Sequence, residues 1–136
     1  MSKIIYSKSD GTVAVITSAS SDINDAIKDV PSGISYEIID ESKLPTDRKF
    51  RNAWVKGSGE VTEDVTKSKV LAHETRREKR TAEFKPHDDI ISLNIPGQDA
   101  GAAETARAAI RTKYATMQTN IDNATDIAGI KTALGG

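Results

Sequence analysis

The sequence predicts an α+β protein, in which a small N-terminal mixed β/α head (residues 1–59) precedes a C-terminal antiparallel helical hairpin (residues 60–136). Two observations support this prediction. β-Branched residues, glycine and proline dominate before residue 60, whereas alanine, lysine, arginine and glutamate dominate after it. Apolar residues also recur at steps of three or four in the last third of the chain, which is the spacing of a packed helical face.

The start of the head is predicted to form a β-hairpin. Residues 3–6 and 12–17 are rich in isoleucine and valine, and Asp10-Gly11 lies between them. An Asp-Gly pair supplies the positive-φ conformation that tight hairpin turns require. Residues 34–39 alternate in the manner of a strand and are predicted to form a third one.

Shorter elements complete the predicted head. A short helix is expected over residues 23–30, because residues 20–22 offer N-cap oxygens before it, and a proline and a glycine follow it. Residues 40–45 are expected to form a turn or a single helical turn. The Gly-Ser-Gly segment at residues 57–59 is predicted to be a flexible joint.

The first helix of the hairpin is predicted over residues 60–84. Residues 61–64 would place acidic groups in its first turn, and arginines and lysines lie towards its end, as the helix dipole favours. Beyond a kink at Pro86, residues 88–93 are able to extend it by two turns. Residues 94–97 are predicted to break the helix.

The second helix of the hairpin is predicted over residues 100–122, followed by a short helix over 127–134 that residues 123–126 cap. Its apolar stripe consists of Ala103, Ala106, Ile110, Tyr114, Met117 and Ile121. The stripe is narrow and rich in alanine, which lets a neighbouring helix approach closely. It would pack either within the chain or between copies, and the second arrangement would give a symmetric oligomer.

Composition predicts a thin core that gains stability from a partner subunit or a larger assembly. Hydrophobic residues make up 37% of the chain and aromatic residues only 4%. The net charge of −1 provides no global field that would favour nucleic acid or an anionic membrane. The absence of cysteine excludes disulfides and thiolate chemistry. We expect neither a signal peptide nor a membrane-spanning helix, because the apolar runs are too short.

Candidate catalytic and metal-binding motifs are incomplete. His73-Glu74 lacks the second histidine of a zinc-protease motif, because Arg77 stands at that position, and a solvated helix face is the better interpretation. His87-Asp88-Asp89 has no further histidine or cysteine nearby to complete a transition-metal site, so we expect one of its aspartates to cap a helix. The sequence therefore predicts a protein that is not an enzyme and holds no cofactor or metal.

The only concentration of basic residues lies in the first hairpin helix. Its members are Lys67, Lys69, Arg76, Arg77, Lys79 and Arg80. Spread over four turns, they are expected to point all around the helix, and Arg77 is expected to pair with Glu74. Nucleic-acid binding is therefore not favoured, because it needs basic residues on one face and usually stacking aromatics.

Two aromatic residues and two arginines cluster before the glycine pair. They are Arg48, Phe50, Arg51 and Trp54. Tryptophan and arginine dominate binding hot spots, so one interpretation is an interface anchor. The other is that the aromatics belong to the core of the head with arginines beside them. The second is slightly favoured, because a thin core needs its only tryptophan.

A local pattern resembles a group of small tailed-bacteriophage proteins. Residues 44–54, LPTDRKFRNAW, are similar to the LP-x-DR-x-FR-x-AW pattern of that group, and the order of elements is similar over most of the chain. Such proteins are generally encoded among tail and virion genes, often without an assigned function. The resemblance implies synthesis in the host cytoplasm, association with the virion, other phage structural proteins as partners, and no catalytic residues.

The resemblance leads us to expect a structural or accessory component of the tail, the tail tip or the fibre attachment, acting through protein–protein contacts. Two alternatives stay open. The protein would be an assembly chaperone if it is absent from the mature particle. It would be a small DNA-binding regulator if the basic helix at residues 67–80 contacts phosphates.

Overall fold

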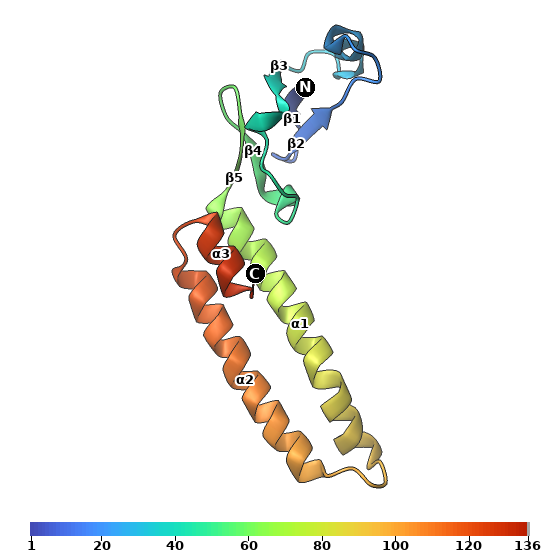
Figure 1. The fold of residues 1–136 in the computed structure, drawn as a ribbon, viewed down its shortest axis with the longest axis vertical. Helices are drawn as coiled ribbons and strands as arrows, with labels where there is room; N and C mark the ends of the chain where they lie inside the picture. Colours follow the sequence, from blue (N-terminus) through green and yellow to red (C-terminus); the bar gives the residue numbers. More distant parts are fainter. Residues whose placement is uncertain (136) are drawn as a thin grey trace. The chain divides into compact units, whose positions relative to one another are not determined.

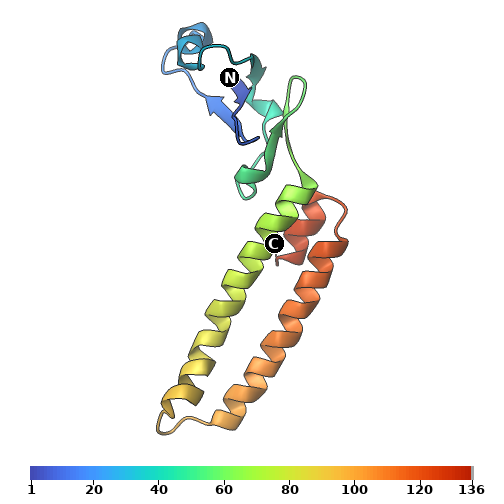
Figure 2. The same ribbon diagram turned by 180° about the vertical axis from the view of Figure 1, so that it is seen from behind.

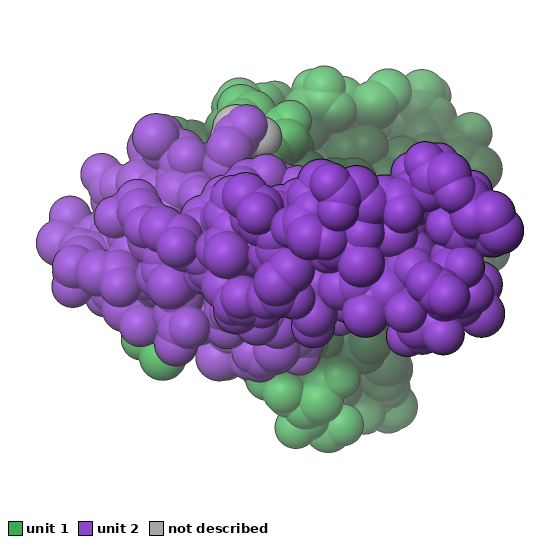
Figure 3. Space-filling model, turned by 90° about the horizontal axis from the view of Figure 1, so that it is seen from below, with its two compact units in different colours: residues 1–68 green, residues 69–136 purple. Residues whose placement is uncertain are grey.

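The computed structural model describes residues 1–135 and confirms the α+β class. Two small antiparallel sheets form the N-terminal part, and two long helices with a shorter third one form the C-terminal part (Figure 1). The chain divides into two compact units, residues 1–68 and 69–136, which are coloured separately in Figure 3. This division lies nine residues beyond the change in composition, because residues 61–63 belong to a strand of the first unit.

The first sheet contains the predicted hairpin and the predicted third strand. Strands β1 (Ser2–Ser7), β2 (Val13–Ile16) and β3 (Tyr36–Asp40) lie in the order β2-β1-β3, and both pairings are antiparallel. The turn between β1 and β2 depends on Gly11, whose φ of 84° is readily adopted only by a residue without a Cβ. The Asp-Gly signal therefore located this turn correctly.

Short helical turns connect these strands. The predicted first helix is a 3₁₀ helix, η1 (Ile23–Asp29), whose N-cap Asp22 accepts a hydrogen bond from the Asn24 N–H. The single helical turn expected after β3 is η2 (Glu41–Lys43), capped by Asp40. A third turn, η3 (Arg51–Ala53), leads into the next strand.

The second sheet corrects the prediction of a flexible joint. Strands β4 (Trp54–Lys56) and β5 (Val61–Glu63) pair antiparallel, and residues 57–59 form the turn between them. The Gly57 N–H donates to the Glu60 carbonyl at 2.9 Å, and Gly59 has a φ of 72°. The two glycines thus serve a tight hairpin turn, and the acidic first helical turn expected at residues 61–64 is wrong.

An apolar cluster joins the strands of the first unit. It consists of Ile5, Val13, Ile39, Trp54 and Val61, with Val15 and Leu44 packed against it. Ile5 and Val15 face each other across β1 and β2, so their side chains lie on the same face of the sheet. Trp54 and Val61 come from β4 and β5. The first unit is therefore built around apolar side chains from both sheets.

Helix α1 (Val65–Leu93) starts later and ends later than the predicted first helix. Asp64 begins it by accepting a hydrogen bond from the Lys67 N–H at 2.8 Å. The helix continues through Pro86 to Leu93, so residues 88–93 extend it as the sequence had allowed. His87-Asp88-Asp89 therefore lies inside the helix, and the expectation that an aspartate of this group is an N-cap is wrong. The predicted break follows, with Asn94 and Gly97 at positive φ.

Helix α2 (Ala100–Asn123) and helix α3 (Ile127–Ala133) match the predicted segments closely. Asp99 caps α2, and Asp126 caps α3 by accepting from the Gly129 N–H at 2.7 Å. Helix α2 runs antiparallel to α1, and α3 folds back beside α2 (Figures 1 and 2). The predicted helical hairpin is confirmed.

The two long helices are separated by large side chains. Phe84 from α1 packs with Ile110 and Tyr114 from α2, and Met117 lies against this cluster. The backbones of α1 and α2 stay apart over most of their length, whereas α3 approaches α2 closely. The alanine-rich stripe therefore does not bring α1 close, because an aromatic side chain from each helix fills the space between them.

Candidate interaction surfaces

The aromatic and arginine cluster belongs to the first unit's interior. Phe50 and Trp54 are each 2% exposed, so the structure places them in the core, as the slightly favoured interpretation had it. The guanidinium carbons of Arg48 and Arg51 lie 5.6 and 4.5 Å from the centre of the Trp54 ring. Arg51 also donates to the Val13 carbonyl at 2.6 Å. Burial, and secondarily the charge of Arg48, lowers the pKa of Arg51 from its ordinary value.

An exposed apolar strip lies on strand β3 and the residues before it. Ile34, Tyr36 and Ile38 alternate along the chain and are 41%, 39% and 43% exposed. Alternate residues of a strand point to the same face, so Tyr36 and Ile38 share one surface of the sheet. Strand β3 is also an edge strand, because it pairs only with β1. We call these three residues the β3 strip.

The other face of β3 is well satisfied within the first unit. Ile39 is buried in the apolar cluster, and Glu37 accepts a hydrogen bond from the Gly59 N–H at 3.0 Å. Lys56 lies 3.3 Å from the same carboxylate. The Gly59 hydrogen bond, and next that of Lys56, lower the pKa of Glu37. The contrast shows that β3 uses one face for its own unit and leaves the other open.

Sequence reasoning identified β3 as a strand but did not single out this strip. The available signal was the Ile38-Ile39 pair in a strand that also carries Tyr36. Two adjacent apolar residues in a strand place apolar side chains on both faces, and a small unit covers only one of them easily.

The apolar stripe of α2 faces inward. Ala103, Ile110, Tyr114 and Ile121 are buried, while Ala106 and Met117 are half-buried. Burial, and next the neighbouring Glu83 carboxylate, raise the pKa of Tyr114. Of the two arrangements that the sequence left open, the structure shows packing within the chain around Tyr114.

Polar side chains link the helices of the second unit. His73 is one of them, because its Nε2 lies 2.8 Å from Asp122 Oδ1 of α2. The sequence had predicted a solvated helix face at this position, and the structure instead places the His73 side chain against α2. Asp88 pairs with Arg107 at 2.9 Å, which is the role that the structure gives it in place of helix capping. Lys113 and Glu83 form a further ion pair between the helices at 2.6 Å.

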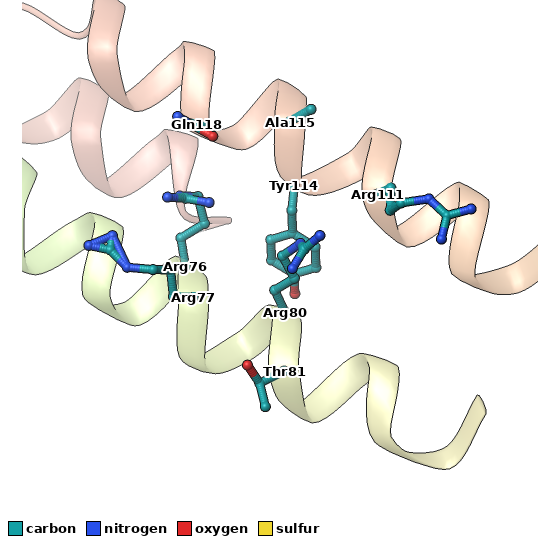
Figure 4. A pocket seen from close by; sticks show the side chains of 8 residues that line it. All are labelled: Arg76, Arg77, Arg80, Thr81, Arg111, Tyr114, Ala115 and Gln118. Carbon is teal, nitrogen blue, oxygen red and sulfur yellow. The ribbon is translucent and has the colours of Figure 1, made fainter. Parts of the chain in front are cut away.

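A basic hollow of about 370 Å³ lies on the second unit between α1 and α2 (Figure 4). The residues that line it are Arg76, Arg77, Arg80, Thr81, Arg111, Tyr114, Ala115 and Gln118. Three arginines of the basic helix line this hollow, whereas Lys69 and Lys79 donate to the Asp122 and Leu134 carbonyls outside it. Arg111 was missed in the sequence, because it lies on the other helix and only the hairpin brings it near.

No family model, curated protein or solved structure matches this chain. Within residues 1–135, none of the helices is both long and apolar enough to cross a bilayer. The same residues contain no group of three or more histidine or acidic side chains arranged to hold a metal ion.

Proposed function

We propose that this protein is a structural or accessory component of a tailed-phage virion that acts through protein–protein contacts. The resemblance of residues 44–54 to small phage proteins gives the setting. The β3 strip is the observation that carries the contact function, because three large apolar side chains are exposed to water on an edge strand and just before it.

Several features of the first unit suit a contact module. Its core fixes β3 from behind through Ile39 and Trp54, so the strip is presented on a rigid support. A rigid surface loses little conformational entropy when a partner covers it. A partner that buries Tyr36 and Ile38 removes apolar area from water, which favours binding.

The composition of purified virions from the parent phage tests this proposal. Mass spectrometry would quantify the chain against the major tail protein, and a fixed ratio of copies per particle is expected. Presence in infected lysate with absence from particles would contradict a structural role and favour the assembly chaperone instead.

A pair of matched substitutions tests the β3 strip itself. Ile38→Lys places a charge in the strip, and Val70→Lys places one at an exposed apolar residue of α1 that is 54% exposed. Both positions are at the surface, so both variants are expected to fold. The ratio of this chain in particles should fall for Ile38→Lys and stay unchanged for Val70→Lys. Equal incorporation of both variants would exclude the strip as the contact surface.

A further inference from the structure

The basic hollow is lined by arginines from both long helices. Arg76, Arg77, Arg80 and Arg111 line it, and none of its lining residues carries a carboxylate. Figure 4 shows that these side chains come from both helices, with Arg76, Arg77 and Arg80 on α1 and Arg111 on α2. The whole chain has a net charge of −1, so this charge is a local feature of one surface.

Three of the four guanidinium groups have no carboxylate partner among residues 1–135. Arg76 donates from Nε to His73 Nδ1 at 3.1 Å, and Arg80 lies over the Phe84 ring at 4.7 Å. Arg77 is exposed, and within the described chain it forms no hydrogen bond or ion pair, including the pair with Glu74 that the sequence suggested. No carboxylate of the described residues therefore pairs with these three groups.

Of the acidic residues on these helices, Glu83 and Glu104 form ion pairs, whereas Glu74 and Glu78 are exposed and do not line the hollow. Arg111 alone has a carboxylate partner, Glu104 at 2.8 Å, and that carboxylate also pairs with Arg107 at 2.7 Å. Glu83 is held by Lys113 at 2.6 Å. Arginines four residues apart on a helix, such as Arg76 and Arg80, repel each other. An anion in the hollow would relieve this repulsion.

We propose that the basic hollow is a binding site for a phosphate group. Guanidinium groups present paired N–H donors in a planar fork that matches two phosphate oxygens at once. The Thr81 hydroxyl and the Gln118 amide add neutral donors at the same surface. Four guanidinium groups from two helices that line one hollow suit an anion with three or more acceptor oxygens and up to two charges better than a single carboxylate.

The site recognises the phosphate and not an attached base or ring. Tyr114 is the only aromatic residue that lines the hollow, and it is 2% exposed because it packs in the helix interface. Stacking on a nucleobase requires an accessible aromatic face. The phosphate therefore comes either from a small phosphorylated molecule or from a nucleic-acid backbone, and the two sources differ in measurable ways.

Calorimetric titration of the full chain with pyrophosphate at low salt tests the site. The variant Arg77→Ala/Arg111→Ala removes two exposed guanidiniums, and Lys28→Ala/Lys85→Ala removes two exposed lysines outside the hollow. The first variant should weaken pyrophosphate binding by about tenfold or more, because charge-assisted hydrogen bonds are lost. The second should change it by less than about twofold.

Titration with a short single-stranded oligonucleotide distinguishes the two possible sources of the phosphate group. If the ligand is a nucleic-acid backbone, the oligonucleotide binds more tightly than pyrophosphate, and the salt dependence of its affinity weakens in the arginine variant. If the ligand is a small phosphorylated molecule, pyrophosphate binds and the oligonucleotide does not bind more tightly. Either pattern supports the site.

Two results would overturn the site. One is that neither pyrophosphate nor the oligonucleotide binds the intact chain at low salt; the other is that the lysine variant loses as much affinity as the arginine variant. Circular dichroism monitors folding of every variant. If the double variant loses its helical signal, Arg77→Gln replaces it, since this side chain makes no contact that holds the helices together.

Discussion

Each of the two units of this protein is stabilised internally in its own way. The first unit has an apolar cluster from two sheets, and its members are Ile5, Val13, Ile39, Trp54 and Val61. The second unit has a smaller cluster around Phe84, Ile110 and Tyr114. Cations flank that smaller cluster: Arg80 lies 4.7 Å and Arg107 5.8 Å from the Phe84 ring centre, and Lys113 lies 5.2 Å from that of Tyr114.

The two units also use their few aromatic residues differently. The first unit uses Phe50 and Trp54 inside its core, where apolar burial supplies most of the stability. The second unit places one aromatic on each long helix and surrounds them with long charged side chains. Arginine and lysine cover apolar surface with their methylene stems while the charged end stays in water. We therefore expect the stability of the first unit to depend on the volume of its buried side chains. The stability of the second unit should depend on buried volume and also on the charged side chains around its cluster.

Trp54→Ala should produce the largest effect and should be confined to the first unit. Removing a fully buried tryptophan leaves a cavity between the sheets, and the expected loss is about 3–5 kcal/mol of the free energy of unfolding. Urea denaturation, followed by amide resonances of β1 and of α2, measures the two units separately. Ile34→Ala is the control, because this side chain is 41% exposed, and it should change stability by less than about 0.5 kcal/mol. A loss below about 1 kcal/mol for Trp54→Ala would show that Trp54 does not organise the core.

Phe84→Ala should have a smaller effect, confined to the second unit. The expected loss is about 2–3 kcal/mol, below the usual range for phenylalanine, because the cluster is small and its ring is 9% exposed. Phe84→Leu keeps most of the apolar volume but removes the ring face beneath Arg80 and Arg107. This second variant should lose about 1 kcal/mol. Equal losses for the two variants would assign the whole effect to the aromatic face and none to volume.

The same contrast explains how much the sequence predicted. Strands β1 to β3 and helix α2 were predicted because each carries its own local signal: an Asp-Gly turn, an alternating pattern or a helical stripe. Strand β5 was missed, because three residues joined to a long polar helix carry no period of their own. Its pairing with β4 comes from the Gly57–Gly59 turn, which has the same composition as a linker.

The surfaces were harder to predict than the elements. The burial of Trp54 followed from composition, since a small core needs its largest side chain. The basic hollow did not follow, because it requires Arg111 and Arg77 to line the same surface, and these residues are 34 positions apart in the chain. The sequence predicted a helical hairpin but not which faces of its two helices meet. In the structure these faces are defined by the contact between Phe84 and Tyr114. The periodicity of a mostly polar helix does not identify such a face.

The ion pair between Glu83 and Lys113 tests the charge dependence of the second unit. The Lys113 hydrogen bond is the largest cause that lowers the pKa of Glu83 from its ordinary value of 4.5. A lowered carboxyl pKa contributes stability above the unfolded pKa, and this contribution disappears as the pH falls through the folded one. Lys113→Met should raise the pKa of Glu83 in an NMR titration and slightly lower the melting temperature. Lys85→Met is the control, and an unchanged pKa in Lys113→Met would show that the pair does not form in solution.

The smallest effect is expected at Asp40 of the first unit, whose carboxylate accepts hydrogen bonds mainly from the nearby Ser42. Hydrogen bonds from Ser42, led by its backbone N–H, and next the N-terminal amine lower the pKa of Asp40 from 3.8 to about 2. Its stabilising contribution is therefore complete above pH 3.8 and is lost as the pH falls through about 2. NMR titration of the Asp40 carboxyl carbon measures this directly.

Two changes separate the causes at Asp40. Ser42→Ala keeps the backbone N–H, which donates to Asp40 at 3.0 Å, so it should raise the pKa only part of the way to 3.8. Acetylation of the N-terminus removes the charge of the amine that lies 3.3 Å away and should also raise the pKa of Asp40. If acetylation caused the larger of the two rises, the distant amine would influence the Asp40 carboxylate more than the Ser42 hydroxyl does. The two units would then differ only in how much charged groups contribute to their stability, because charged groups distant in sequence would stabilise both.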